Sequence, residues 1–438
     1  MKKMMLAFIS ALLLFQTTGI ADNKHISKPT IDVVYGWIAR DNSAAGKNTK
    51  DALLLLKEEK YDLAIHNCTT AIYTNPKSAI AYYIRGIALS EKGEYDLGIL
   101  DYTKAIELNP RASVCYTSRG ITHMYQHFYD LAIADFSKAI EINPSAVAAY
   151  TNRGICYTTQ KGQYDLAILD FNKALAIKSD NAEIFYGRGL SYANQNEFEK
   201  AINDFNKALE LDPNYIDAYL DRGVCYGKRG QYDLAIADHT KMIELSPSDG
   251  EGYFNRGLSY ANLHKYDLAI ADFDKAVTLN PTSEKYHYFR GLNFEKQNRY
   301  DLAIADYSNV LEINPSDNKS YFGRGICYTS IRQYNLAITD LSKAVELDSN
   351  NGEAFYFRGC CYAELGQLEL AIDDFDKVIG FKPNFPMVYF YKGTILDRMN
   401  NQNEALSAYK MFLQYASQKS VQEIEYAKRR IQEIGSSH

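Results

Sequence analysis

Two histidines provide the first spacing in the chain that could support chemistry. His123 and His127 are four residues apart, which on a helix would place two imidazoles on one face, as in some metal sites. No carboxylate or cysteine at a suitable spacing completes such a ligand set. His123 also falls in a position that is tyrosine in most of the related segments described below. Packing in the core is therefore the preferred interpretation, and we expect no metal site.

The remaining polar residues do not suggest catalysis. None of the eight histidines forms a recognisable triad with a nucleophile, and no glycine motif of the phosphate-binding kind is present. Paired carboxylates occur in helical segments that are rich in charge, where exposure to solvent is the default. We therefore expect no enzyme activity and no cofactor.

The seven cysteines bear on the compartment. An odd number cannot pair fully. Four of them, Cys156, Cys225, Cys327 and Cys361, occupy one equivalent position in different segments, roughly 8–10 Å apart even between neighbours, which is too far for a disulfide. They are interpreted as small buried hydrophobic residues.

Arginine and aspartate recur together along the chain. The dipeptide Arg-Gly repeats with a step of 34 residues, and one step of 35, at Arg85, Arg119, Arg153, Arg188, Arg222, Arg256, Arg290, Arg324 and Arg358. Aspartate recurs in phase at Asp101, Asp135, Asp170, Asp204, Asp238, Asp272, Asp306, Asp340 and Asp374. An arginine on an apolar helix face needs a partner, because an unpaired buried charge costs several kcal/mol. We expect structural ion pairs, formed either within a segment or between a segment and its successor; nine arginines facing an anionic ligand is the rival interpretation.

The elements that carry these residues are helices in pairs. In residues 113–146, hydrophobic periodicity predicts one amphipathic helix from Ser113 to Gln126 and a second from Tyr129 to Ile142. Asn143 and Pro144 end the second helix, because proline disfavours helix at and before its own position. Eight of the ten prolines mark segment boundaries in this way.

The pattern resembles the tetratricopeptide repeat. That family has an aromatic residue four before a glycine, a tyrosine three after it, and then alanine, phenylalanine and proline in fixed order within 34 residues. About eleven such segments cover residues 45–419. The resemblance implies an all-α fold, an α-solenoid of stacked helix-turn-helix repeats that bury their apolar faces against one another.

The same resemblance implies a binding surface. In this family the first helices line a concave groove, so two positions should face it: the residue three before each glycine and the residue just after it. The first position holds Phe254, Tyr288, Phe322, Tyr356 and Phe390 in five successive segments, with Tyr83 and Tyr186 earlier in the chain. The second holds Ile87, Ile121, Ile155, Leu190, Val224, Leu258, Leu292 and Ile326. These side chains either anchor an apolar partner or pack adjacent first helices together.

The two ends of the chain differ from the repeats. Residues 1–21 have a basic start, an apolar stretch from Met4 to Phe15 and small residues at Gly19 and Ala21, which is typical of an export signal. Residues 22–44 hold a possible short covering helix with Trp37. Residues 420–438 hold a capping helix, expected from Ser420 to Ile434 with Gly435 just beyond its end, and a tail.

We expect an exported protein, periplasmic or secreted, that has no membrane span once the signal is removed. The net charge is −6 and no basic stripe appears, which argues against nucleic acid as a partner. The favoured hypothesis is a non-catalytic scaffold, an assembly or adaptor factor that holds other polypeptides along the groove. The alternatives are a carbohydrate or cell-wall processing activity and self-association through the groove.

Overall fold

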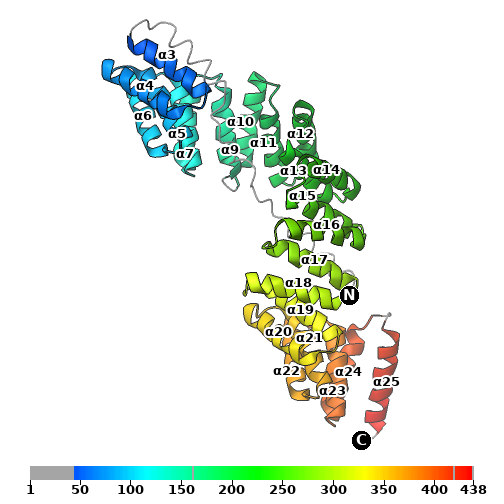
Figure 1. The fold of residues 1–438 in the computed structure, drawn as a ribbon. Coiled ribbons are helices and arrows are strands. Elements are labelled where there is room, and N and C mark those ends of the chain that lie inside the picture. The colour runs from blue at the N-terminus through cyan, green and yellow to red at the C-terminus, as the bar shows by residue number, and fades with distance from the viewer. Residues whose placement is uncertain (1–43, 160–161, 418–419, 437–438) are drawn as a thin grey trace. The chain divides into compact units, whose positions relative to one another are not determined.

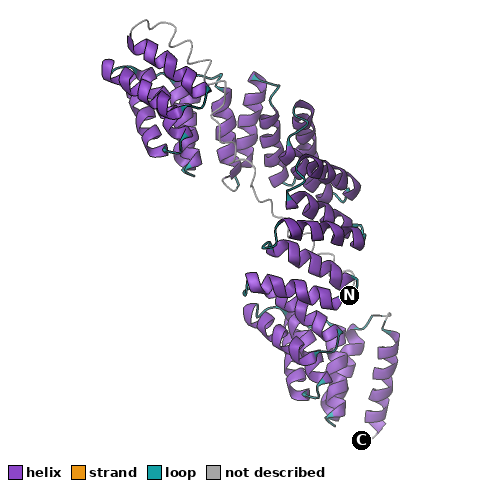
Figure 2. Cartoon of the chain, in the orientation of Figure 1, coloured by secondary structure: helices purple, strands orange, loops and turns teal. Residues whose placement is uncertain are grey.

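The computed structural model describes residues 44–159, 162–417 and 420–436, and every regular element in these residues is a helix (Figure 2). The predicted signal segment, Trp37 and the expected covering helix lie outside the described residues. The helices alternate as eleven antiparallel pairs followed by one more helix (Figure 1). The expected all-α solenoid of paired helices is confirmed.

The described chain divides into two compact units, and the boundary in the sequence falls between Leu245 and Ser246. The helices of unit 1 are α3 (Ala44–Lys57), α4 (Tyr61–Thr74), α5 (Ala79–Glu91), α6 (Tyr95–Leu108), α7 (Ser113–Tyr125), α8 (Tyr129–Ile142), α9 (Val147–Thr159), α10 (Tyr164–Ile177), α11 (Ala182–Asn194), α12 (Phe198–Leu211), α13 (Ile216–Lys228) and α14 (Tyr232–Leu245).

Unit 2 continues the alternation and adds the last helix. Its helices are α15 (Gly250–Asn262), α16 (Tyr266–Leu279), α17 (Glu284–Lys296), α18 (Tyr300–Ile313), α19 (Asn318–Ser330), α20 (Tyr334–Leu347), α21 (Gly352–Glu364), α22 (Leu368–Phe381), α23 (Pro386–Arg398), α24 (Gln402–Tyr415) and α25 (Val421–Ser436). The last helix packs against α24 and runs through Gly435 to Ser436, two residues further than the expected end at Ile434. Glycine ends a helix only where the chain turns into the left-handed region.

Most helix pairs are held together by a small residue and a ring of the second helix; Cys68 and Leu341 replace the ring in α4 and α20. Within the pair α7–α8, Ala132, Phe136 and Ala139 are fully buried. The two helices approach so closely that a Cβ added at Gly120 would lie 2.8 Å from the Phe136 ring. Interiors are packed as densely as organic crystals, so this glycine leaves no room for a side chain.

A residue with positive φ lies in the turn that joins the two helices of a pair. His127 has φ of 62°, and its neighbour Phe128 donates its backbone N–H to the His123 carbonyl at 2.9 Å. This is the hydrogen bond of a Schellman turn, which ends a helix and reverses the chain. His127 therefore serves the turn, and its Nδ1 lies 3.0 Å from the Tyr129 hydroxyl.

Candidate functional site

The arginine side chains join the two helices of their own repeat. Arg119 is bidentate on Asp135, with its Nε and Nη2 at 2.9 and 2.7 Å from the two carboxylate oxygens. The same pairing occurs at Arg153–Asp170, Arg188–Asp204, Arg222–Asp238, Arg256–Asp272, Arg290–Asp306, Arg324–Asp340, Arg358–Asp374 and Arg85–Asp101. The aspartates are buried and neutralise the arginines. Little positive charge is therefore left on the arginines to bind an external anion.

The third guanidinium nitrogen makes a contact that the sequence analysis did not anticipate. Nη1 of Arg119 donates to Thr103 Oγ1 in the preceding repeat at 2.9 Å, and Nη1 of Arg324 donates to Ser308 Oγ at 2.8 Å. All of these arginines except Arg290 also lie over the aromatic ring three residues before them, as Arg119 does over Tyr116 with its Cζ 5.8 Å from the ring centroid. One guanidinium thus ties two repeats together, and the in-phase hydroxyl or amide side chains were the signal that could have shown it.

The predicted groove residues fall into two sets. Eight are buried: Tyr83, Ile87, Ile121, Ile155, Tyr186, Leu190, Phe254 and Leu258. Seven are only partly buried: Val224 in unit 1, and Tyr288, Leu292, Phe322, Ile326, Tyr356 and Phe390 in unit 2. The two interpretations left open by the sequence thus apply to different residues.

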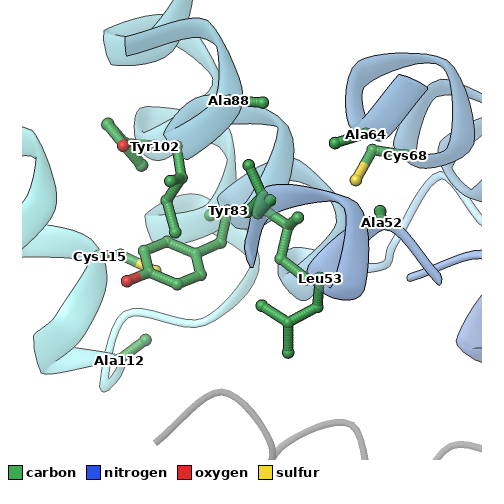
Figure 3. Packing of buried hydrophobic residues seen from close by; sticks show 13 residues of the cluster. Ala52, Leu53, Ala64, Cys68, Tyr83, Ala88, Tyr102, Ala112 and Cys115 are labelled. Carbon is green, nitrogen blue, oxygen red and sulfur yellow. The ribbon is translucent and has the colours of Figure 1, made fainter. Parts of the chain in front are cut away.

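The buried set packs between helices. In unit 1, Tyr83 lies among Leu53, Tyr102 and Cys115, and its hydroxyl is 3.2 Å from Ser118 Oγ (Figure 3). The Tyr186 ring is covered by Tyr215 of the next repeat, with ring centroids 4.7 Å apart. These side chains belong to the core and are not available to a ligand.

Tyr186 also reaches a carboxylate on the neighbouring first helix. Its hydroxyl donates to Asp221 Oδ2 at 2.7 Å. Burial raises the pKa of Asp221 to about 7, because the charged carboxylate is poorly solvated there. The contact links α11 to α13, as the Tyr83–Ser118 contact links α5 to α7.

The partly buried set includes a row of rings on successive first helices of unit 2, which we call the aromatic row: Tyr288, Phe322, Tyr356 and Phe390. Three further rings, missed by the sequence analysis, lie next to it at Phe289, Phe357 and Tyr391. The ring centroids of Phe322 and Phe357 are 6.1 Å apart, as are those of Tyr356 and Tyr391. The rings of successive first helices are therefore in contact. Tyr391 is 37% exposed.

The chemistry of this row is apolar. Burial raises the pKa of the Tyr288 and Tyr356 phenols, so both stay neutral and serve as rings with a polar end. At the end of the row, Phe390 contacts Phe412 and Tyr426, with ring centroids at 5.2 and 5.8 Å. The row is therefore held by the second helices and α25 while one side of it stays accessible.

The structure brings no metal-binding group together in the residues that it describes. His123 Nε2 lies 3.9 Å from Asp135, and burial lowers the pKa of His123. His287 is buried in an aromatic position and is hydrogen-bonded through both ring nitrogens, to Asp306 at 3.1 Å and to the Pro281 carbonyl at 3.0 Å.

The described helices are all unsuited to crossing a bilayer, since none is both long and apolar enough. All seven cysteines have free thiols, and only Cys360 is partly exposed.

Comparison with known families identifies the class to which these stacked helix pairs belong. Models described as tetratricopeptide repeat match residues 79–111, 182–215, 250–283, 284–317 and 352–385, then residues 205–237, and then residues 319–351. A model described as TPR repeat matches residues 158–196. The chain belongs to the tetratricopeptide repeat family, whose scaffold fold is consistent with protein–protein interaction.

Solved structures with similar folds include other members of the class. YrrB, described as a TPR protein with an unusual peptide-binding site, is 28% identical; the match covers 41% of this chain and 92% of that chain at a TM-score of 0.37. MamA from Desulfovibrio magneticus is 25% identical, with 39% and 96% covered at a TM-score of 0.37. Yeast Tom70 is 16% identical, with 88% and 95% covered at a TM-score of 0.37. No curated protein matches the chain.

Proposed function

We propose that the chain is a non-catalytic scaffold that holds a polypeptide partner against the aromatic row of unit 2. The carrying observation is the partial exposure of the row in four successive repeats, whereas the equivalent Tyr83, Tyr186 and Phe254 are buried. Partly buried rings that are held by their neighbours lose little conformational freedom when they bind, which suits them as anchors.

The spacing of the row favours an extended segment of the partner. Neighbouring packed helices lie roughly 8–10 Å apart. An extended chain in the polyproline II conformation advances about 3.1 Å per residue with three residues per turn, so every third side chain lies on the same side and would meet the next ring. The partner segment is thus expected to carry apolar side chains at positions i, i+3 and i+6, and its affinity would come from those anchors.

The role and the compartment complete the proposal. The export signal predicted in residues 1–21 supports a role as an assembly or adaptor factor in the periplasm or outside the cell. Binding through affinity, without turnover, is the function that this face supports best.

Replacement of Phe322 and Tyr356 by alanine tests the proposal. We expect the double variant to lose most of the partner captured from the native compartment, and to bind the identified partner at least about tenfold more weakly, since two anchors are removed. The measurement is quantitative affinity capture followed by titration of the purified partner.

The control is Leu220→Ala, which changes the same position of a repeat in unit 1 where no row exists. Circular dichroism should show the same helix content in all variants. Equal capture by the wild type and the Phe322→Ala/Tyr356→Ala variant would rule out the aromatic row as the binding face.

A further inference from the structure

A second apolar surface lies at the helix ends of the last repeats of unit 2. It consists of side chains from two positions of each repeat: Leu302, Leu336 and Leu370, which are third residues of the second helices α18, α20 and α22, and Ile331, Leu365 and Met399, which follow the first helices α19, α21 and α23. We call these six residues the turn ridge. It is separate from the aromatic row, and nothing in the proposed function uses it.

Contacts in the other repeats show that the two positions are neighbours. The residue after a first helix reaches back to the second helix of the preceding repeat: Gln297 donates to Asp267 at 2.7 Å, Gln126 to Asp96 at 2.8 Å, and Lys92 to Asp62 at 2.7 Å. Each of these aspartates directly precedes the leucine position. In the turn ridge this polar contact is replaced by Ile331, Leu365 and Met399, which cannot make it, so the apolar side chains of adjacent repeats follow one another.

The ridge leucines are not needed for folding. Leu302, Leu336 and Leu370 are 42%, 49% and 46% exposed, whereas the alanine after each of them is fully buried and makes the helix contact. The same position holds Lys200 in α12 and Glu404 in α24, and both helices form normally.

An apolar surface of this size needs a partner. Six aliphatic side chains that are left partly exposed amount to a few hundred Å², the size at which apolar patches on monomers are usually functional. A stable interface buries about 800 Å² per partner, so the ridge would form the core of such an interface and its charged surroundings the rim.

The charges beside the ridge indicate which partner fits. Within three residues of ridge members lie three exposed cations, Arg299, Arg332 and Arg398, and four exposed anions, Asp301, Glu364, Glu369 and Asp373. A surface that carries both signs in nearly equal numbers can meet a copy of itself across a twofold axis with opposite charges in contact. A strongly charged partner or an anionic membrane would meet charges of both signs and gain little net attraction. We propose that a second copy of this chain covers the turn ridge, giving a homodimer.

The test is sedimentation velocity of the full chain over a range of concentrations. We expect the wild type to pass from monomer to dimer as its concentration rises. Leu336→Lys with Leu370→Lys should raise the dimer dissociation constant at least about tenfold, because two side chains that the dimer interface would bury become charged. Leu131→Lys is the matched control, since it changes the same position in unit 1, where the neighbouring Gln126 is polar.

A second pair of variants tests the charge pairing. Arg332→Glu with Arg398→Glu, and Glu364→Arg with Glu369→Arg, should each dimerise more weakly than the wild type, and an equimolar mixture of the two should form heterodimers. Circular dichroism should show unchanged helix content in every variant.

The proposal is overturned by a wild type that stays monomeric at all concentrations. It is also overturned if the Leu336→Lys/Leu370→Lys variant keeps the wild-type dissociation constant, or if the wild type is monomeric and that variant loses a different captured protein. Phe322→Ala with Tyr356→Ala should leave dimerisation unchanged, so failure of the aromatic row and failure of the ridge are distinguishable.

Discussion

At the residue scale, one polar position of each repeat carries several contacts at once. Arg290 pairs with the buried Asp306 in its own repeat and donates through Nη1 to Asp274 of the preceding repeat at 2.7 Å. Removing the arginine would leave a buried carboxylate without its partner, and such losses cost several kcal/mol. This explains why the Arg-Gly pair recurs with so few exceptions.

The position four before the glycine shows how one residue type can replace another. Tyr389 donates its hydroxyl to the Pro383 carbonyl at 2.9 Å, and His287 makes the equivalent contact to Pro281 through Nε2. Because Nδ1 of His287 also lies 3.1 Å from Asp306, both ring nitrogens face acceptors. Only the protonated imidazole can donate to both.

A pH dependence follows for His287. Its hydrogen bond to Asp306, helped by the Pro281 carbonyl and opposed by burial and by Arg290, raises the pKa of the imidazole in the folded state. The stabilisation is fully present below the unfolded pKa of about 6.5 and is lost as the pH rises through the folded value. We expect the wild type to gain stability over His287→Tyr at about pH 5 compared with about pH 8, measured as the difference in urea midpoints.

The His287→Tyr variant is itself the control, because tyrosine occupies this position in most repeats. A stability difference between the two proteins that is the same at both pH values would contradict the assignment. The titration can also be followed as the imidazole proton signal that the variant lacks.

At the scale of elements, close approach of paired helices decides which glycines can change. In α7, Gly120 lies against the buried Phe136 ring, whereas nothing comes within 4 Å of the place of a Cβ on Gly227 in α13. The first glycine is required by packing, and the second only weakens its helix.

The two glycines therefore predict changes of opposite sign. Gly120→Ala should lower the free energy of unfolding by about 1–3 kcal/mol, because the added methyl overpacks the helix pair. Gly227→Ala should raise it by about 0.5–1 kcal/mol through helix propensity. Urea denaturation of both variants is the measurement, and stabilisation by Gly120→Ala would show that the helix pair is looser than described.

The turns between paired helices were less predictable than the helices. Positive φ occurs at Gly93, Gly230 and Gly366, as glycine's freedom allows, but also at His127 and Arg332. The Schellman hydrogen bonds impose this conformation on whatever residue falls there, so the residue type alone does not reveal it.

At the scale of the whole molecule, the chain presents two kinds of surface in unit 2, the aromatic row and the turn ridge. The first is proposed to hold a partner and the second to join two copies. Both arise from repeats that keep apolar residues at the helix-packing positions and differ at the positions left exposed.

Free cysteines occur in both units of the chain. Burial raises the pKa of the thiols, to about 12 for Cys68, Cys115 and Cys156, so almost no reactive thiolate forms. This accounts for free thiols in a chain that we propose to be exported. We expect the six buried thiols to resist a disulfide reagent such as dithiobisnitrobenzoate in the native protein at about pH 8, and all seven to react in denaturant.

Partly exposed Cys360 provides the internal comparison, because it should be the first thiol to react. Rapid labelling of several thiols in the native protein would contradict the burial described here and would make disulfide formation during export a risk.

The sequence by itself determined the repeat, the helix pairs and the family, because a 34-residue period is written in residues such as Ala132, Phe136 and Pro144 whose local roles are the same in every copy. It also predicted that arginine and aspartate would pair. The register of that pairing, within each repeat, was decided by the tertiary structure, since both registers suit the spacing. Tertiary structure also decided which groove positions are covered: Tyr186 is shielded by Tyr215 of the next repeat, whereas Phe322 stays partly exposed. Exposure depends on how far each neighbour covers a side chain, which a single repeat's sequence does not contain.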